Sequence, residues 1–176
     1  MSRPAFIYGG PPEVNFGALG FIITHKLMHG FDVTGRLFDG LGELNDWFTD
    51  MSRNAYEERE ICHARSIENS PKARHFVDYP GEYLADTMGT DSLLKAYKKA
   101  SLNSTVTLCD VKGLTSDQLF YVSRCLVWCG KIFPDTTHPP LDERCNVPLM
   151  NSDHFSDTFR CPTGAPMNSP IKCRFW

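Results

Sequence analysis

The sequence lacks the features that mark membrane-spanning, nucleic-acid-binding and disordered proteins. No apolar stretch approaches the roughly 20 residues that a membrane-spanning helix needs. The net charge is −3 and charged residues make up 22% of the chain. There is neither the basic excess that binds nucleic acid nor a block of like charges typical of a disordered tail. We therefore expect a globular protein with no membrane span and no nucleic-acid partner.

The N-terminal residues Met1 to Pro4 contain no apolar signal region, so this stretch gives no signal for secretion. Two features nevertheless suit an oxidising, secretory compartment, namely seven cysteines and the N-glycosylation sequon at Asn103. An odd number of cysteines leaves at least one thiol free or paired outside the chain. We expect an extracellular or secretory-pathway protein, and we interpret the chain as a fragment or a truncated gene product. A cytosolic protein with reduced cysteines is the alternative.

The spacing of apolar residues predicts one mainly helical domain over residues 1–176, with little β-structure. The first helix is expected at about 15–29, where apolar residues from Phe16 to Leu27 recur every three or four positions. Further helices are expected at about 45–61, 81–99 (weakened by Gly89), 115–128 (opened by a capping box from Thr115 to Gln118) and 152–160. Irregular or looped segments are expected at 1–14, 34–45, 66–80 and 101–114, and an extended or looped one in the proline-rich residues 130–150.

Two pairs of polar residues have the spacing of a zinc site. His25 and His29 are four residues apart on a predicted helix, which places both imidazoles on one face. Glu82 and Asp86 have the same spacing on another predicted helix, so Glu82 can act as a third ligand and Asp86 can support an imidazole. Taken alone, each pair is more commonly two surface histidines or a solvated acidic face. Together the pairs describe coordination by two histidines and a glutamate, with a fourth position open to water.

Short motifs surround the two pairs in a fixed order. Residues 15–20 (Asn-Phe-Gly-Ala-Leu-Gly) are followed by residues 25–32 (His-Lys-Leu-Met-His-Gly-Phe-Asp) and by residues 81–86 (Gly-Glu-Tyr-Leu-Ala-Asp). These motifs resemble the zinc helix and the Gly-Glu-Asn-x-Ala-Asp motif of the neprilysin and endothelin-converting-enzyme family of zinc metallopeptidases. Residues 35–47, 127–130 and 172–176 also resemble that family. The resemblance implies the C-terminal catalytic segment of such an enzyme, a thermolysin-like zincin lobe that binds one zinc ion and acts on peptides.

The resemblance implies a role for each matching polar residue near the metal. His25, His29 and Glu82 match the zinc ligands. Asp86 and Asp32 match the carboxylates that orient the ligating imidazoles, which fixes the tautomer that binds metal.

The resemblance also implies residues that contact the substrate. His138 matches a histidine that stabilises the oxyanion of the tetrahedral intermediate, and Arg144 matches an arginine that holds the substrate carbonyl. Without the resemblance, both would be taken as surface residues of a proline-rich segment. Four apolar residues match positions that line or support the pocket for the residue after the cleaved bond, although a plain core role is equally compatible with them: Phe21, Ile22, Val127 and Trp128.

The catalytic position departs from the family pattern. The family motif is His-Glu-x-x-His, and Lys26 stands where that glutamate would take a proton from zinc-bound water. An ammonium group cannot accept a proton, and a unit positive charge ~5 Å from a divalent ion costs ~7 kcal/mol at an effective dielectric constant of ~20. Either zinc stays and Lys26 turns aside into solvent, or zinc is lost and Lys26 pairs with Glu82. Hydrolysis should be severely impaired in both cases.

Other family features have no match in this chain. The family has an Asn-Ala-aromatic strand and a large N-terminal helical lobe upstream of the zinc helix, and a lobe supplied in trans is one way to complete the site. Cys62 and Cys173 match a disulfide of the family. Cys129 and Cys161 match residues whose usual partners lie in the upstream region, so they are free or paired with an atypical cysteine. The pairing of five cysteines is left open: Cys109, Cys125, Cys129, Cys145 and Cys161.

We therefore expect a neprilysin-like zinc metalloendopeptidase domain that binds peptides and is catalytically impaired by Lys26. The first alternative is an active zinc endopeptidase that cleaves on the amino side of hydrophobic residues, which requires another residue to act as the base. The second alternative is a non-enzymatic protein that uses the cleft to bind a peptide or a partner subunit. Zinc content and peptide turnover distinguish the three.

Overall fold

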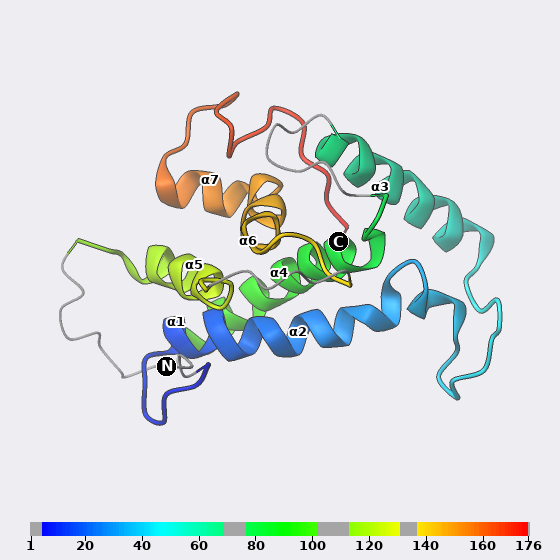
Figure 1. Ribbon diagram of the computed structural model, residues 1–176, viewed down its shortest axis with the longest axis horizontal. Coiled ribbons are helices and arrows are strands. Elements are labelled where there is room, and N and C mark those ends of the chain that lie inside the picture. Colours follow the sequence, from blue (N-terminus) through cyan, green and yellow to red (C-terminus); the bar gives the residue numbers. More distant parts are fainter. Residues whose placement is uncertain (1–4, 69–76, 102–112, 131–136, 176) are drawn as a thin grey trace.

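In this computed structural model every regular element of the described residues is a helix, apart from one antiparallel bridge between Phe38 and Leu44 (Figure 1). The mainly helical fold with little β-structure that the sequence predicts is confirmed. The structure describes residues 5–68, 77–101, 113–130 and 137–175. The elements are α1 (Pro12–Asn15), a π-helical turn (Phe16–Gly20), α2 (Phe21–Met28), two 3₁₀ turns (His29–Phe31 and Gly35–Leu37), α3 (Asp50–Glu68), α4 (Pro80–Ser101), α5 (Ser116–Leu126), α6 (Leu141–Met150) and α7 (Asp153–Phe159).

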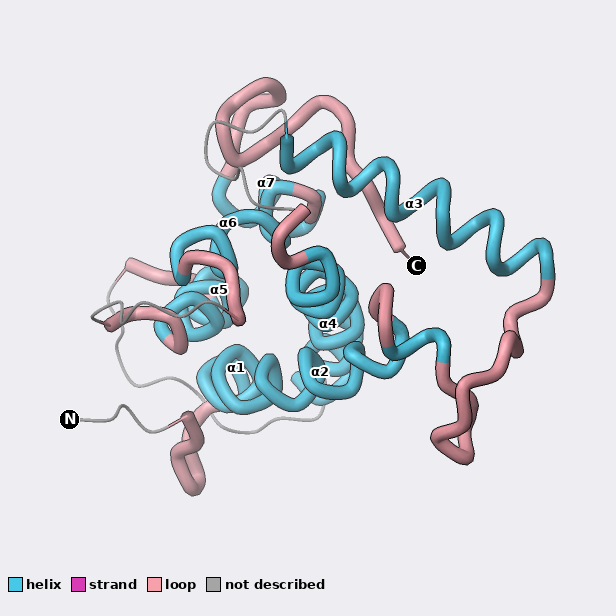
Figure 2. The backbone as a smooth tube through the Cα atoms, turned by 45° about the vertical axis from the view of Figure 1, so that its right-hand side comes forward, coloured by secondary structure: helices cyan, strands magenta, loops and turns pink. Residues whose placement is uncertain are grey.

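Helix α4 runs through the middle of the molecule and contacts both α2 and α6 (Figure 2). Near its N-terminus, Tyr83 and Leu84 pack with residues of α3, α6 and the C-terminal Phe175 in one apolar cluster. Further along the same helix, Leu93 and Tyr97 pack with residues of α2, α5 and α6 in a second cluster. Because one helix takes part in both clusters, the polar residues that it carries between them are held in fixed positions.

Gly89 lies on α4 between the two clusters, where α4 passes α2. A Cβ atom at this position would lie only 3.1 Å from the backbone nitrogen of His25 and 3.2 Å from its Cα. Glycine inside a helix costs about 1 kcal/mol relative to alanine, and here it permits the close approach of two helix backbones. The residue that weakens the sequence prediction of this helix is therefore the one that lets α2 and α4 meet.

The N-terminal helical segment starts earlier than predicted, at Pro12, and its buried face differs from the predicted apolar stripe. Ile23 and Leu27 belong to that stripe, yet they are 51% and 62% exposed. The buried residues of α2 are Phe21 and His25. The π-helical turn before α2 carries an extra residue per turn, which shifts the angular register of the helix that follows. A stripe read with one helical period across both segments therefore points to the wrong face of α2.

The sequence predicts an extended or looped segment at 130–150, and this is wrong for residues 141–150, which form α6. Pro140 directly precedes the helix, where proline is compatible with a helix start. Pro148 lies inside the helix, where proline lacks the N–H that would bond to the carbonyl of Arg144 and ordinarily costs about 3 kcal/mol. That carbonyl instead accepts hydrogen bonds from Nη1 and Nη2 of Arg124, each at 3.4 Å. A donor from α5 thus offsets the defect.

The remaining predicted helices are present with shifted ends. Helix α3 begins and ends several residues later than predicted, while α4 and α7 agree with the predictions to within two residues. Helix α5 begins with the predicted capping box, in which Thr115 and Gln118 exchange side-chain and backbone hydrogen bonds. None of the described helices is both long and apolar enough to cross a membrane.

Candidate metal centre

The two pairs of polar residues predicted from the sequence meet between α2 and α4. Nε2 of His25 and Nε2 of His29 are 3.1 Å apart. The carboxylate oxygens of Glu82 lie 3.5 Å from Nε2 of His25 and 3.4 Å from Nε2 of His29. One ligand atom from each residue lies within 4.8 Å of the others. The helical spacing of the histidines and the contact between α2 and α4 therefore bring three possible metal ligands to one point, and these residues, His25, His29 and Glu82, are called the triad below.

Each imidazole is supported from behind by an aspartate. Oδ1 of Asp86 lies 2.8 Å from Nδ1 of His25, and Oδ2 of Asp32 lies 2.7 Å from Nδ1 of His29. When Nδ1–H donates to a carboxylate, Nε2 keeps its lone pair. Both lone pairs then face Glu82, which is the orientation that a metal ion requires.

The ionisation of both aspartates suits this role. Complete burial acts to raise the pKa of Asp86, but hydrogen bonds from His25 and Arg144, together with the charge of Arg144, hold that pKa below its ordinary value. Partial burial likewise acts to raise the pKa of Asp32. Hydrogen bonds from His29 and from the backbone amides after Asp32 outweigh it and lower the pKa. Both side chains are therefore carboxylates at neutral pH.

The loop that carries Asp32 is shaped around the second histidine. Oδ1 of Asp32 accepts hydrogen bonds from the backbone amides of Thr34 and Gly35, each at 2.8 Å. A Cβ atom on Gly35 would lie 1.7 Å from the carbonyl oxygen of His29. Only glycine fits at this position, so Gly35 allows the loop to turn back tightly and place Asp32 against His29.

Arg144 links the polar groups on the buried side of the site. Its guanidinium forms two hydrogen bonds with Asp86, at 2.9 and 3.0 Å, and Nη2 lies 3.0 Å from Oε2 of Glu82. The guanidinium carbon also stands 4.0 Å from the centre of the Trp128 ring. Arg144 is only 3% exposed, so the suggestion of a surface residue from its proline-rich setting is wrong.

His138 approaches the site from the solvent side. Its Nε2 lies 3.6 Å from Oε1 of Glu82, and its side chain is 32% exposed. Nδ1 of His138 lies 2.8 Å from the hydroxyl of Thr137. The ring therefore stands beside the triad with one edge in solvent.

The four apolar candidates lie on the flank of the site formed by α2 and the end of α5. Phe21 is fully buried and packs edge-on against Trp128, with ring centres 5.7 Å apart. Ile22 and Val127 are half-buried. The indole nitrogen of Trp128 is buried without a hydrogen-bond partner. This geometry suits a pocket wall and an ordinary core equally well.

Lys26 lies between the two histidines of the triad in sequence. Its side chain is exposed, and no hydrogen bond or ion pair joins it to any described residue. The cation that contacts Glu82 is Arg144. The pairing of Lys26 with Glu82, one of the two outcomes considered from the sequence, is absent from this part of the chain.

Two disulfides lie within the described residues. The bond between Cys62 and Cys173, which the family resemblance implies, is present. The second bond joins Cys125 to Cys145 and settles one of the pairings that the sequence leaves open. Two cysteines are free in the described part: Cys129 and Cys161. Cys109 and the sequon at Asn103 lie outside the described residues.

Arg124 is a site residue that the sequence analysis missed. It is fully buried, and its guanidinium donates to the hydroxyl of Thr90 at 3.0 Å and to the carbonyls of Arg144 and Cys145. It therefore supports α6 at the residue that carries the second arginine. Its spacing was a usable signal, because Phe120 and Arg124 are four residues apart and so share one face of α5.

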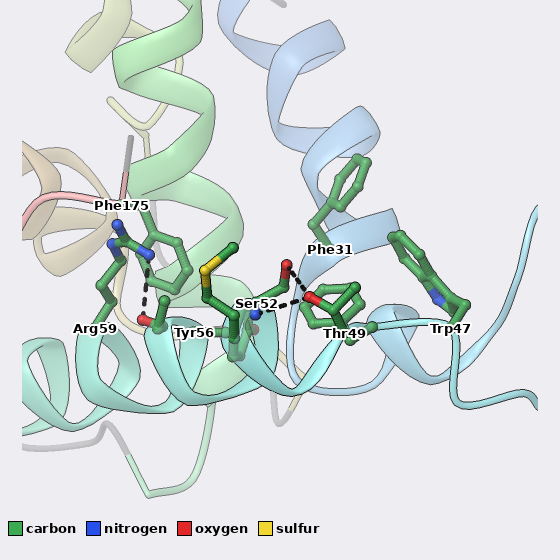
Figure 3. Close-up of a pocket in the computed structure, with 10 residues that line it drawn as sticks. Phe31, Trp47, Thr49, Ser52, Tyr56, Arg59 and Phe175 are labelled. Carbon is green, nitrogen blue, oxygen red and sulfur yellow. Dashed lines mark hydrogen bonds between the residues drawn. The ribbon is translucent and has the colours of Figure 1, made fainter.

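A groove lies apart from the triad, between α3 and the loop after α2 (Figure 3). Its volume is about 630 Å³. Arg59 and the hydroxyl groups of Thr49 and Ser52 are its main polar groups. The rest of its lining is apolar: Phe31, Trp47, Phe48, Met51, Ala55, Tyr56 and Phe175.

The residues of the triad fit a divalent cation. Nε2 of His25 and Nε2 of His29 lie 3.1 Å apart, and Oε2 of Glu82 is buried without an aligned hydrogen-bond donor, although Nη2 of Arg144 is near. A cation satisfies all of these acceptors at once. Two histidines and a carboxylate are a donor set that zinc prefers, and three protein ligands leave the fourth position that catalytic zinc keeps open. The fold and this site together define a metallopeptidase of the zincin class.

Comparison with known proteins identifies the family. The model of peptidase family M13 matches residues 1–175. Neprilysin-1 of Caenorhabditis elegans is 32% identical over the whole chain, and human endothelin-converting enzyme 1 is 33% identical. The inhibitor-bound zinc metalloprotease ZMP1 of Mycobacterium tuberculosis superposes on 99% of the chain with a TM-score of 0.82 and 27% identity. A Haemonchus galactose-containing glycoprotein complex also gives a TM-score of 0.82, with 26% identity over 98% of the chain.

The chain belongs to peptidase family M13 and is a neprilysin-like peptidase domain. It spans only part of its relatives, namely 26% of neprilysin-1, 24% of human endothelin-converting enzyme 1, 29% of the ZMP1 chain and 31% of the Haemonchus chain. Membership of a zinc metallopeptidase family agrees with the donor set of the triad.

Proposed function

We propose that this chain is a peptide-binding zinc module in which Lys26 severely impairs hydrolysis. The observation that carries the proposal is that the triad and its supporting aspartates have ligand geometry, while an exposed lysine follows His25 directly. His25, His29 and Glu82 hold the zinc ion in this proposal. Zinc supplies a polarised water or carbonyl when bound.

The residues around the triad have defined tasks in this proposal. Asp86 and Asp32 keep each Nε2 lone pair on the metal side, as their hydrogen bonds to Nδ1 indicate. His138, at the solvent edge of the site, donates to the oxygen of a bound peptide carbonyl. Arg144 holds the Glu82 and Asp86 carboxylates in place and presents its remaining N–H groups to the peptide. Phe21 and Trp128 form the apolar side.

Lys26 deprives this site of a general base. General-base catalysis contributes about 10²- to 10⁴-fold to a proton-transfer step, and an ammonium group cannot supply it. The exposure of Lys26 supports the outcome in which zinc stays, because the long side chain reaches solvent and avoids most of the repulsion from the metal. The contact of Arg144 with Glu82 argues against the other outcome, in which Lys26 pairs with Glu82, because Glu82 already has a cationic neighbour.

The first experiment measures zinc in the purified, folded protein by elemental analysis, and then measures cleavage of a quenched fluorescent peptide by the parent chain and by Lys26→Glu. We expect about one zinc per chain in both. We also expect no cleavage by the parent and cleavage at least about a hundredfold faster in the variant.

Lys99→Glu is the matched control, because it makes the same charge change at an exposed position near the far end of α4. Comparable cleavage by the parent and by Lys26→Glu would contradict the proposal and favour an active endopeptidase. Peptide binding without zinc and without turnover in either protein would favour a purely non-enzymatic binding role.

The proposal includes two statements about setting. Peptides are the ligands. The location is extracellular or in the secretory pathway, which the disulfides Cys62–Cys173 and Cys125–Cys145 support. The location is tested by purifying the chain from a host that expresses it through the secretory pathway and by identifying both intact disulfides with mass spectrometry.

A further inference from the structure

The carboxylates of the site all face inward. Asp86 is fully buried between His25 and Arg144. Asp32 is 6% exposed and its oxygens are engaged by His29 and by backbone amides. The Glu82 side chain is 16% exposed and faces the imidazoles. A ligand that arrives from solvent therefore meets little of the negative charge of the site.

The side chains of the site that are exposed to solvent are basic residues. The side chains of His29 and His138 are 28% and 32% exposed, and Lys26 is exposed. Lys26 precedes His29 by three residues, and residues with this spacing are neighbours on a helix surface. No described carboxylate pairs with Lys26, so its charge is available to a ligand beside His29.

Lys26 also changes the charge of the site. The described charged groups are three carboxylates (Asp32, Glu82 and Asp86) and three cations (Lys26, Arg124 and Arg144), which balance when the imidazoles are neutral. A divalent ion adds two positive charges. A glutamate at residue 26 would remove this excess and leave the loaded site without net charge.

We propose that the surface beside the metal triad selects peptides that carry a carboxylate, which pairs with Lys26. The inference rests on the proposed peptide-binding function and adds the class of peptide. The physical basis is the complementarity between an exposed, unpaired ammonium group and an acidic side chain, at a site whose own carboxylates are turned inward. Such a pair discriminates between otherwise identical peptides by charge and weakens as salt screens it.

The test uses fluorescein-labelled peptides of the form Gly-Gly-Phe-x-x-x-amide, in which glutamate or glutamine occupies each of the three positions after phenylalanine in turn. Fluorescence anisotropy gives the dissociation constants of the zinc-loaded chain and of the chelator-treated chain. We expect the glutamate peptide to bind at least about threefold more tightly than its glutamine partner in one register at low salt. The difference should disappear at about 0.5 M salt.

Lys26→Met and Lys99→Met are the matched variants, because both remove an exposed lysine from a helix surface. The preference for glutamate should vanish in Lys26→Met and persist in Lys99→Met. Equal binding of both peptides by the parent, or a preference that survives Lys26→Met, overturns the inference and leaves peptide binding intact. Absence of binding by every peptide overturns the proposed function as well.

Discussion

His63 is a buried histidine on α3 whose two ring nitrogens have no hydrogen-bond partner. It is 1% exposed and stacks on Phe175, with ring centres 5.4 Å apart. Burial lowers its pKa from 6.5 to about 4. The neutral ring therefore acts as an aromatic packing group in the core.

This histidine should make stability depend on pH. Between its ordinary pKa of 6.5 and its folded pKa of about 4, the unfolded chain binds a proton that the folded chain does not. Stability is therefore lost as pH falls through this window, by up to about 3 kcal/mol. We expect His63→Leu to be more favourable relative to the parent at pH 5 than at pH 7.5 in urea unfolding. A pH-independent difference would contradict this, since every other group is common to both proteins.

Replacing the carboxylate of Asp32 by an amide tests whether this side chain supports metal binding. In Asp32→Asn the side chain can still accept hydrogen bonds from the amides of Thr34 and Gly35, but it loses the charge that supports His29. We expect zinc affinity to fall by about 10- to 100-fold, measured by competition with a chromophoric chelator. Asp39→Asn is the control, because Asp39 also accepts backbone amides in a nearby loop and contacts no imidazole. Equal zinc affinity in parent and Asp32→Asn would show that Asp32 does not support the metal.

At the residue scale, spacing predicted the pairs but not their surroundings. The four-residue interval between His25 and His29 was sufficient to place two imidazoles on one face. The burial of Arg144 depends on α6, a helix that the prolines of residues 130–150 make hard to predict from the sequence. The exposure of Lys26 depends on side-chain freedom that no sequence pattern encodes. Gly35 is needed because of a backbone approach to His29 that only the folded loop reveals.

At the scale of elements, α5 and α6 form a unit that positions Arg144. Pro148 removes the intrahelical donor to the Arg144 carbonyl, and Arg124 replaces it from α5. The disulfide between Cys125 and Cys145 joins the residues that directly follow the two arginines. Three separate features therefore meet within one turn of α6. Helix propensity alone cannot predict a helix that depends on a donor from another element.

Replacing Arg124 should disturb this unit in a graded way. In Arg124→Met the carbonyl of Arg144 loses its donor, which costs roughly 1–3 kcal/mol for a buried unsatisfied group. We expect the free energy of unfolding to fall by at least this amount and peptide affinity to fall with it. Arg124→Lys keeps one charged donor and should lose less of both. Unchanged stability in Arg124→Met would contradict the role of Arg124 in α6.

At the scale of the whole molecule, several large apolar side chains are exposed on the described surface. Ile23 and Leu27 project from α2, and Trp47 and Met51 line the groove in Figure 3 at 44% and 80% exposure. Large contiguous apolar patches on soluble proteins ordinarily mark contact surfaces. The relatives of this chain are about four times as long, and a longer chain has residues of its own to cover such surfaces.

This surface leads to an expectation for the 176-residue chain studied by itself. Apolar area removed from water contributes roughly 25 cal/mol per Å², so copies of the chain gain free energy by covering the exposed faces of α2 and of the groove. Sedimentation velocity at increasing concentration should show reversible self-association. Association should weaken in a variant that combines Leu27→Gln with Met51→Gln, and it should persist in Ile171→Gln, which changes an exposed apolar residue elsewhere on the surface. A parent chain that stays monomeric at high concentration would mean that these faces tolerate water and do not drive association.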